Sequence, residues 1–222
     1  MSDGVLLIGV SGGSASGKTE IARAAARGAQ GLTTMVLSED DYYGDHGAAP
    51  DFDPAAFNFD HPQSRDHTLL LEQLRALKSG HSVEAPIYDL TIHRRRSDTR
   101  VLQPCDVIIV EGIHLFCSEA LRDLFDLRVY VKAPDDIRLS RRILRDVRER
   151  GRTADTVVSQ YLRWVRPMHH AWTSPTQHSA DIVIVNDEAA ARPADHLEAF
   201  FDGLAEPVAK AIADYGQSKH SN

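Results

Sequence analysis

The feature that most constrains this chain is a short glycine-rich segment near its amino terminus. Residues 12–19 fit the pattern G-x-x-x-x-G-K-[ST], whose glycines let the backbone turn tightly and direct N–H groups at a polyphosphate. Lys18 supplies a positive charge for the β- and γ-phosphates, and the Thr19 hydroxyl can ligate Mg²⁺. The segment therefore predicts a nucleotide site, and the alternative is a surface loop rich in glycine and serine.

The flanking sequence favours the nucleotide site over the surface loop. The apolar run at residues 5–10 predicts a strand before the segment, and the pattern at residues 20–27 predicts a helix after it, which is the setting that the motif requires. A helix that begins near Lys18 also directs the positive end of its dipole at a bound phosphate. The predicted nucleotide-binding residues are Gly12, Gly13, Ser14, Ala15, Ser16, Gly17, Lys18, Thr19 and Glu20.

Length and composition limit the classes of protein to consider. A chain of 222 residues with 42% hydrophobic residues can bury one sizeable core, so we expect a single domain over residues 1–222. The net charge of −7 argues against nucleic acid as a partner. No apolar run approaches the roughly 18 residues of a membrane span, so no membrane contact is expected. Cys105 and Cys117 lack metal-type spacing and indicate reduced thiols in a cytoplasmic protein.

The order of apolar and helical segments predicts the fold class. Apolar runs predict strands at residues 5–10, 34–37, 106–110, 127–131 and 181–185. Helical patterns lie at residues 69–78, 134–150 and 194–215. This alternation predicts an α/β fold of the P-loop NTPase type, with a mostly parallel sheet and helices on both faces. Residues 44–59 and 87–102 are expected to be long loops, and residues 216–222 a frayed tail.

Carboxylates follow two of the predicted strands. Glu111 ends the strand at residues 106–110, and three acids, Glu39, Asp40 and Asp41, follow the strand at residues 34–37. Because ligands bind at the carboxyl ends of parallel strands, these acids should share one edge with the phosphate loop. We expect Glu111 on the Mg²⁺ side of the site and one of the other acids as a general base. A solvated strand-end acid and an acidic helix cap are the alternatives.

Two further stretches combine aromatic, acidic and imidazole side chains. Phe59 and Asp60 lie in the first stretch, and Tyr88 and His93 lie in the second. An aromatic ring can hold a planar base, a carboxylate can accept hydrogen bonds from ribose hydroxyls, and an imidazole can read a base edge. Each histidine taken alone is more typical of a surface or core position, and the arginines at residues 94–96 are more typical of a solvated loop.

A basic helix is predicted over residues 136–152, which hold seven arginines. We expect residues 134–165 to form a mobile lid over the transferred phosphates. Ile137, Ser140, Leu144 and Val147 are spaced to form one packed face of this helix. The arginines expected to bind phosphate are Arg142, Arg145, Arg150 and Arg152. Those expected in solvent salt bridges are Arg138, Arg141 and Arg148.

The order of these motifs resembles the uridine–cytidine kinase family, within the wider uridine kinase and phosphoribulokinase group. The resemblance covers residues 5–185 and rests on the phosphate loop, Asn-Phe-Asp-His-Pro at 58–62, Tyr-Asp-x-x-x-His at 88–93 and Glu-Arg-Gly-Arg at 149–152. It implies a cytoplasmic, Mg²⁺-dependent enzyme of pyrimidine salvage that transfers the γ-phosphate of ATP or GTP to the 5′-hydroxyl of uridine or cytidine. It also implies a homo-oligomer, a dimer or a tetramer.

The resemblance further implies roles for individual catalytic residues. Asp40 would take the proton of the nucleoside 5′-hydroxyl, and Thr19 and Glu111 would serve the Mg²⁺. The residues that would stabilise phosphate charge are Lys18, Arg145, Arg150 and Arg152.

The resemblance assigns the nucleoside pocket in the same way. Asp60 and Arg142 would hold the ribose 2′- and 3′-hydroxyls, and Tyr88 and His93 would read the pyrimidine edge. The other pocket residues implied are Phe59 on the base ring and Tyr43 and Gln160 at the pocket wall.

The chain departs from the family pattern at four places, which keeps two alternatives open. Leu90 stands where relatives often carry an aromatic residue, and the other departures are Glu20, Lys132 and residues 186–188. One alternative is the same chemistry on another small alcohol, such as a sugar phosphate, pantothenate or a different nucleoside. The other is a nucleotide-binding regulator with little catalytic activity.

Overall fold

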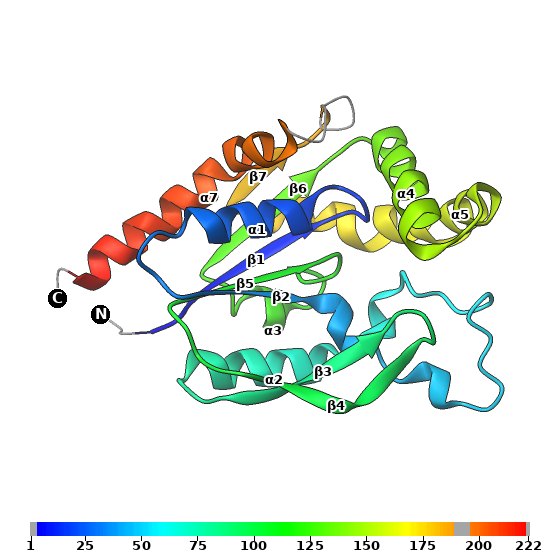
Figure 1. The fold of residues 1–222 in the computed structure, drawn as a ribbon, viewed down its shortest axis with the longest axis horizontal. Coiled ribbons are helices and arrows are strands. Elements are labelled where there is room, and N and C mark those ends of the chain that lie inside the picture. Colours follow the sequence, from blue (N-terminus) through cyan, green and yellow to red (C-terminus); the bar gives the residue numbers. More distant parts are fainter. Residues whose placement is uncertain (1–3, 189–195, 221–222) are drawn as a thin grey trace.

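The computed structural model describes residues 4–188 and 196–220, and its centre is a five-stranded sheet (Figure 1). The strands are β1 (Leu6–Gly12), β2 (Thr34–Ser38), β5 (Val107–Gly112), β6 (Leu127–Lys132) and β7 (Ile182–Val185). They lie in the order β2-β5-β1-β6-β7, and all neighbouring pairs are parallel. Since β1 is central, the segment that follows it lies at the middle of the sheet edge. The predicted parallel α/β sheet is confirmed.

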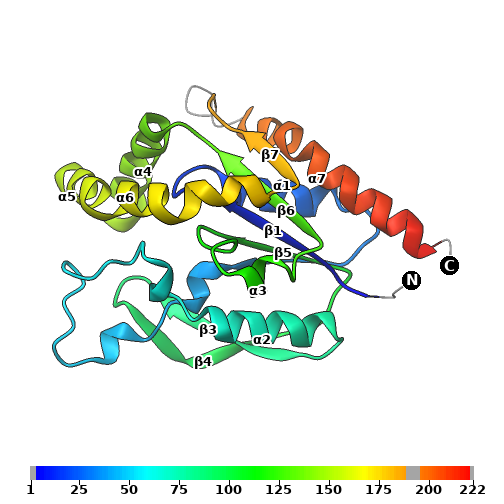
Figure 2. The same cartoon turned by 180° about the vertical axis from the view of Figure 1, so that it is seen from behind.

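Helices cover both faces of this sheet (Figure 1 and Figure 2). They are α1 (Lys18–Gly28) and α7 (Leu197–His220) on one face, and α2 (His67–Lys78) and α3 (Glu119–Arg122) on the other. Ile8 packs in the core under α1 and α7, whereas its neighbour Leu7 packs in the core on the α2 side. Burial on both faces explains the continuous apolar runs of the strands. Within the described residues, no helix combines the length and apolar character needed to cross a bilayer.

Two groups of elements face each other beyond the carboxyl ends of the strands (Figure 1). On one side lie a β3–β4 hairpin and the connection from β2 to α2. These comprise β3 (Val83–Asp89), β4 (Arg94–Leu102), η1 (Glu39–Tyr42), η2 (His46–Ala48) and η3 (Pro62–Ser64). On the other side a helical segment joins β6 to β7. It comprises α4 (Asp135–Arg150), α5 (Ala154–Gln160), η4 (Tyr161–Val165), α6 (Arg166–Met168), η5 (His169–Thr173) and η6 (Ser174–Ser179).

Two sequence predictions about local structure are wrong. Residues 87–102 are not a loop, because β3 and β4 pair there as an antiparallel hairpin. Most of β4 is exposed and charged, so it lacks the apolar pattern that marks a strand. The predicted frayed tail is helical as far as His220, and Gly216 in that part of α7 packs close to Leu32. Residues 194–195 of the predicted last helix and residues 221–222 lie outside the described residues.

Candidate active site

A cavity of about 650 Å³ lies at the carboxyl ends of β1, β2 and β5, within the size range of small-molecule sites. The predicted site residues that line it are Ser14, Lys18, Thr19, Asp40, Tyr43, Phe59, Asp60, His93, Glu111, Arg142, Arg145, Arg150, Arg152 and Gln160. These residues come from segments spread over most of the chain. The fold therefore brings the phosphate loop, the acids, the aromatic stretches and the arginine helix to one place.

The phosphate loop after β1 has a backbone that only glycine accommodates at two positions. Gly12 has φ +149° and Gly17 has φ +95°. A Cβ atom at Gly12 would lie 2.4 Å from the Val131 carbonyl oxygen, and one at Gly17 would lie 2.4 Å from Asn186 Nδ2. Helix α1 then begins at Lys18 without a side-chain cap. Its first N–H groups are therefore free to bind an anion, as a phosphate cradle requires.

Residues far along the chain support this loop. Asn186, which is 1% exposed, donates from Nδ2 to the Ser16 carbonyl at 2.8 Å and is held by Arg141 at 3.2 Å. Arg138 lies against Gly13, where a Cβ atom would be 2.5 Å from Arg138 Nη1. The prediction that Arg138 lies in a solvent salt bridge is wrong, because the residue is 0% exposed beneath the loop.

Oxygen ligands gather beside Lys18. Its Nζ lies 3.9 Å from Glu111 Oε2, and Ser38 Oγ donates to Glu111 Oε1 at 2.8 Å. Thr19 also hydrogen-bonds Glu111, and burial raises the pKa of that carboxyl despite the nearby Lys18. Hydroxyl and carboxylate oxygens suit Mg²⁺. Among the described residues, no group of three or more His, Cys, Asp or Glu is placed to hold a metal ion.

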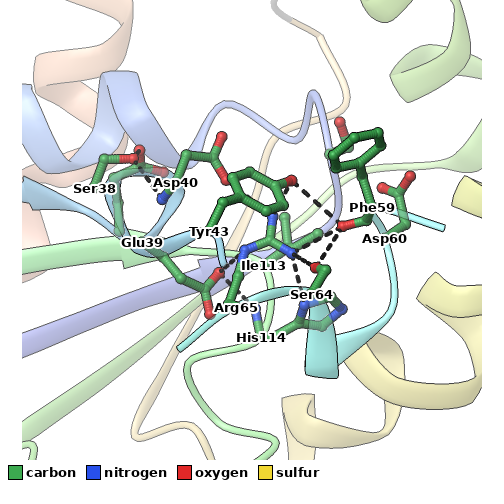
Figure 3. A network of polar contacts seen from close by, with 12 residues as sticks. Ser38, Glu39, Asp40, Tyr43, Phe59, Asp60, Ser64, Arg65, Ile113 and His114 are labelled. Carbon is green, nitrogen blue, oxygen red and sulfur yellow. Dashed lines mark hydrogen bonds and ion pairs between the residues drawn. The ribbon is translucent and has the colours of Figure 1, made fainter. Parts of the chain in front are cut away.

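The three acids that follow β2 have different surroundings. Glu39 is buried, and Asp41 pairs with Arg100 at 3.2 Å. Asp40 alone of these acids lines the cavity, with its side chain 47% exposed. Its Oδ1 accepts a hydrogen bond from Arg65 Nη2 at 2.9 Å (Figure 3). Of the three acids, Asp40 is therefore the one placed to reach a ligand in the cavity.

Aromatic side chains form another part of the cavity wall. His93 stacks on Phe59 with ring centroids 4.5 Å apart, and Tyr43 meets Phe59 edge-on at 5.8 Å. Burial, and then the charge of Arg152, lower the pKa of His93, so its ring is neutral at pH 7. Tyr88 does not line the cavity as the sequence suggests. It is 8% exposed and packs against Tyr43, with centroids 5.0 Å apart.

Four arginines of the predicted lid converge on the carboxylate of Asp146. Arg145 and Arg152 reach its oxygens at 2.8 and 3.2 Å, and Arg142 and Arg150 each lie 3.7 Å away. Asp146 is 0% exposed, and all four arginines line the cavity. Four guanidinium groups against one carboxylate leave a local excess of three positive charges. This excess suits a polyanionic ligand.

The predicted packed face of the arginine helix is also wrong. Leu144 and Val147 are 52% and 41% exposed, whereas the buried residues of α4 are Arg138, Arg142 and Asp146. The reason is that α4 packs against the phosphate loop, where Arg142 Nη1 donates to Ser14 Oγ at 2.8 Å, and not against the apolar core. Charged residues therefore occupy the inner face.

The cavity wall contains several residues that the sequence pattern did not mark. The predicted residues outside its lining are Gly12, Gly13, Ala15, Ser16, Gly17, Glu20 and Tyr88. The missed lining residues are Pro54, Phe57, Arg65, Thr91, Gly112, Ile113, Glu149 and Trp164. Leu90, noted as a departure from the family pattern, lines the cavity as well. Glu20 does not line the cavity and pairs instead with Arg23 on α1 at 3.0 Å. A lone arginine such as Arg65 in a polar stretch carries no local signal of burial.

The fold and the cavity define a class, that of P-loop kinases with a nucleotide-binding loop at the centre of a parallel sheet. The sequence matches the model of the Phosphoribulokinase / Uridine kinase family over residues 7–190. The chain belongs to this family, whose members use a nucleotide as phosphate donor.

Individual relatives agree with this assignment. The chain is 45% identical over 179 residues to a uridine kinase of Geobacillus kaustophilus, covering 81% of this chain and 85% of the relative. It is 44% identical over 179 residues to a uridine kinase of Ligilactobacillus salivarius, covering 81% and 84%. The fold is similar to that of phosphoribulokinase from Rhodobacter spheroides, with a TM-score of 0.60, 18% identity, and coverage of 83% of this chain and 71% of that one.

Proposed function

We propose that this protein is a uridine kinase that transfers the γ-phosphate of ATP or GTP to the 5′-hydroxyl of uridine or cytidine. The observation that carries the proposal is the position of Asp40, in a cavity that is lined both by the phosphate loop and by the Phe59–His93 pair. A donor phosphate and a planar acceptor would then meet beside a carboxylate. The two uridine kinases at 45% and 44% identity support this choice of acceptor.

At the donor end, the phosphate loop and Lys18 would hold the β- and γ-phosphates. Phosphoryl transfer depends mainly on positioning and charge stabilisation, and the convergent arginines Arg145, Arg150 and Arg152 would supply that charge. Thr19 and Glu111 would hold a Mg²⁺ ion, which when bound offsets charge on the phosphates. Residues 134–165 would act as the lid that closes over them.

At the acceptor end, each side chain would contact one part of the nucleoside. Asp40 would accept the proton of the 5′-hydroxyl, and Asp60 and Arg142 would hold the ribose 2′- and 3′-hydroxyls. Phe59 would pack on the pyrimidine ring and His93 would read its edge. Further pocket residues are Tyr43, Gln160, whose Oε1 accepts from Arg152 Nη1 at 3.1 Å, and Tyr88, which would act by supporting Tyr43.

A further part of the proposal concerns the domain organisation, location and partners of the protein. We propose that the chain folds as one domain, works in the cytoplasm, associates as a homo-oligomer and takes neither nucleic acid nor membrane as partner. Size-exclusion chromatography with light scattering measures the oligomeric state directly, and a monomer at micromolar concentration would refute that part.

Turnover measurements with a panel of acceptors test the proposed function. Purified protein with Mg²⁺ and ATP or GTP is given uridine, cytidine, adenosine, pantothenate and a set of sugar phosphates. We expect kcat/KM to be highest for uridine or cytidine. A higher value for a sugar phosphate or pantothenate would reassign the acceptor, and the absence of turnover with every acceptor would favour a nucleotide-binding regulator.

Ribose recognition gives the first prediction. If Asp60 accepts hydrogen bonds from the ribose 2′- and 3′-hydroxyls, 2′-deoxyuridine should be used at least about 10²-fold less efficiently in kcat/KM than uridine, because its missing hydroxyl leaves polar atoms unpaired. Asp60→Ala should remove most of this discrimination. Asp51→Ala, at an exposed residue of the same connection, is the matched control and should keep it. Equal use of both nucleosides by the unaltered protein would contradict the assignment.

Base recognition gives the second prediction. The neutral ring of His93 can donate from one nitrogen or accept at the other, so it can meet the 4-oxo group of uracil or the 4-amino group of cytosine. His93→Tyr should shift the uridine-to-cytidine ratio of kcat/KM by about tenfold, the worth of about one hydrogen bond. His81→Tyr, at an exposed turn, should leave the ratio unchanged. A constant ratio in both His93→Tyr and His93→Ala would remove His93 from base recognition.

A further inference from the structure

Arg65 is a buried cation for which the proposed reaction has no role. It follows η3, and its side chain is only 2% exposed. Removing a guanidinium from water is unfavourable unless charged and polar partners replace the lost hydration. Figure 3 shows these partners arriving from separate segments of the chain, with Arg65 between them. The contacts of Arg65 therefore identify the segments that this residue connects.

The two terminal nitrogens of Arg65 hold different parts of the cavity wall. Nη2 donates to Asp40 Oδ1 at 2.9 Å and to the Tyr43 hydroxyl at 2.6 Å, both beside the β2 strand end. Nη1 donates to the Phe59 carbonyl and to Ser64 Oγ, each at 3.1 Å. Because the guanidinium is planar and rigid, it fixes the distance between these two segments. One segment carries the proposed base, and the other precedes Asp60, the proposed ribose ligand.

Arg65 has a separate ionic partner in Glu39. Its Nε lies 3.4 Å from Glu39 Oε2, and Glu39 is 0% exposed. Burial alone would raise the pKa of Glu39, but Arg65 and the His67 hydrogen bond hold it well below its usual range. Burial, and then Arg65, lower the pKa of His114 to about 3, so its neutral ring accepts from Arg65 Nη1 at 3.3 Å. Glu39 thus balances the charge of Arg65, and the bond to Asp40 is left to orient that carboxylate.

The orientation matters because Asp40 lies at the cavity edge. Arg65 donates to Oδ1 of Asp40, whose side chain is 47% exposed and lines the cavity, so Oδ2 is available to an acceptor hydroxyl. Without Arg65 the side chain of Asp40 would be free to adopt other rotamers. Reacting groups lose rate steeply when they are displaced, by about 10²-fold for a displacement near 1 Å.

We propose that Arg65 is a positioning residue, which holds the general base Asp40 in register with the acceptor-binding segment at residues 59–64. The proposal rests on the proposed function in one respect, since it takes Asp40 as the base. It adds a residue that acts through Asp40 and Tyr43, not on the phosphates. Arg65 would therefore affect the chemical step of the reaction and leave donor binding unchanged.

A double-mutant cycle between Arg65 and Asp40 tests this inference. Arg65→Lys keeps the positive charge beside Glu39 but loses the fork that reaches both segments. We expect it to lower kcat with uridine by about 10²-fold and to leave KM for the nucleotide donor within about threefold. In the Asp40→Asn background the base is already missing, so adding Arg65→Lys should lower kcat by less than about threefold further.

The matched control is Arg100→Lys, which alters the neighbouring pair of Arg100 and Asp41 and should leave kcat unchanged. If Arg65→Lys does not fold, the double variant Glu39→Gln, Arg65→Gln removes both buried charges together and is carried through the same cycle. An unchanged kcat, or a loss of kcat that is equal in the unaltered background and in the Asp40→Asn background, would show that Arg65 has only a structural role and overturn the proposal.

These outcomes are separate from a failure of the proposed function. If the unaltered protein does not phosphorylate uridine, or if Asp40→Asn retains full kcat, the assignment of acceptor or base fails before Arg65 is considered. If the unaltered protein is active and Asp40→Asn is not, the double-mutant cycle tests only the proposed role of Arg65.

Discussion

Lys18→Ala is expected to lower kcat by about 10³-fold or more, because Lys18 is the cation of the phosphate loop and no other lysine lines the cavity within the described residues. In the proposed reaction Lys18 would face charge that develops on the transferred phosphate, where a fixed cation has its largest effect. The loss should appear with every acceptor, since the donor is common to all of them. Steady-state kinetics with ATP or GTP at saturating uridine measures it.

The control for this prediction is Lys210→Ala, an exposed lysine on α7 outside the cavity lining, which should keep full activity. Circular dichroism and the thermal midpoint are needed as well, because Lys18→Ala leaves the buried carboxylate of Glu111 without its ion pair. A well-folded Lys18→Ala protein with near-normal kcat would remove the nucleotide site from this loop.

Asp40→Asn is expected to lower kcat by about 10²–10⁴-fold with a modest change in the KM for uridine. The amide keeps the shape of the carboxylate and can still accept from Arg65, but it cannot take the proton of the 5′-hydroxyl. Binding of the nucleoside should therefore persist while the chemical step slows. Initial rates over a range of uridine concentrations separate the two parameters.

Asp41→Asn is the matched control for Asp40→Asn, since Asp41 is the next residue and faces Arg100 outside the cavity. It should change kcat by less than about threefold. If the large loss of kcat occurs in Asp41→Asn while Asp40→Asn stays active, the role of general base moves to Asp41.

The sequence by itself determined the features that depend on residues close together in the chain. The phosphate loop is one continuous segment, so its spacing identifies it without any tertiary information. The five strands of the parallel sheet and the main helices follow from local apolar periodicity, whereas the β3–β4 hairpin does not. One general rule of parallel sheets then placed Asp40 and Glu111 on the same edge as Lys18, and the cavity contains all three.

Only the tertiary structure decided which polar residues are buried and what they hold. Arg138 and Arg65 have no local pattern that marks them as buried, because their partners come from other segments. In the phosphate loop, Arg138 contacts Ser14, which lies 124 positions earlier in the chain. Asn186 donates a hydrogen bond to Ser16 of the same loop, 170 positions earlier. A buried charge is stable only where its partners converge, so its burial depends on the packing of the whole fold and not on the identity of its sequence neighbours.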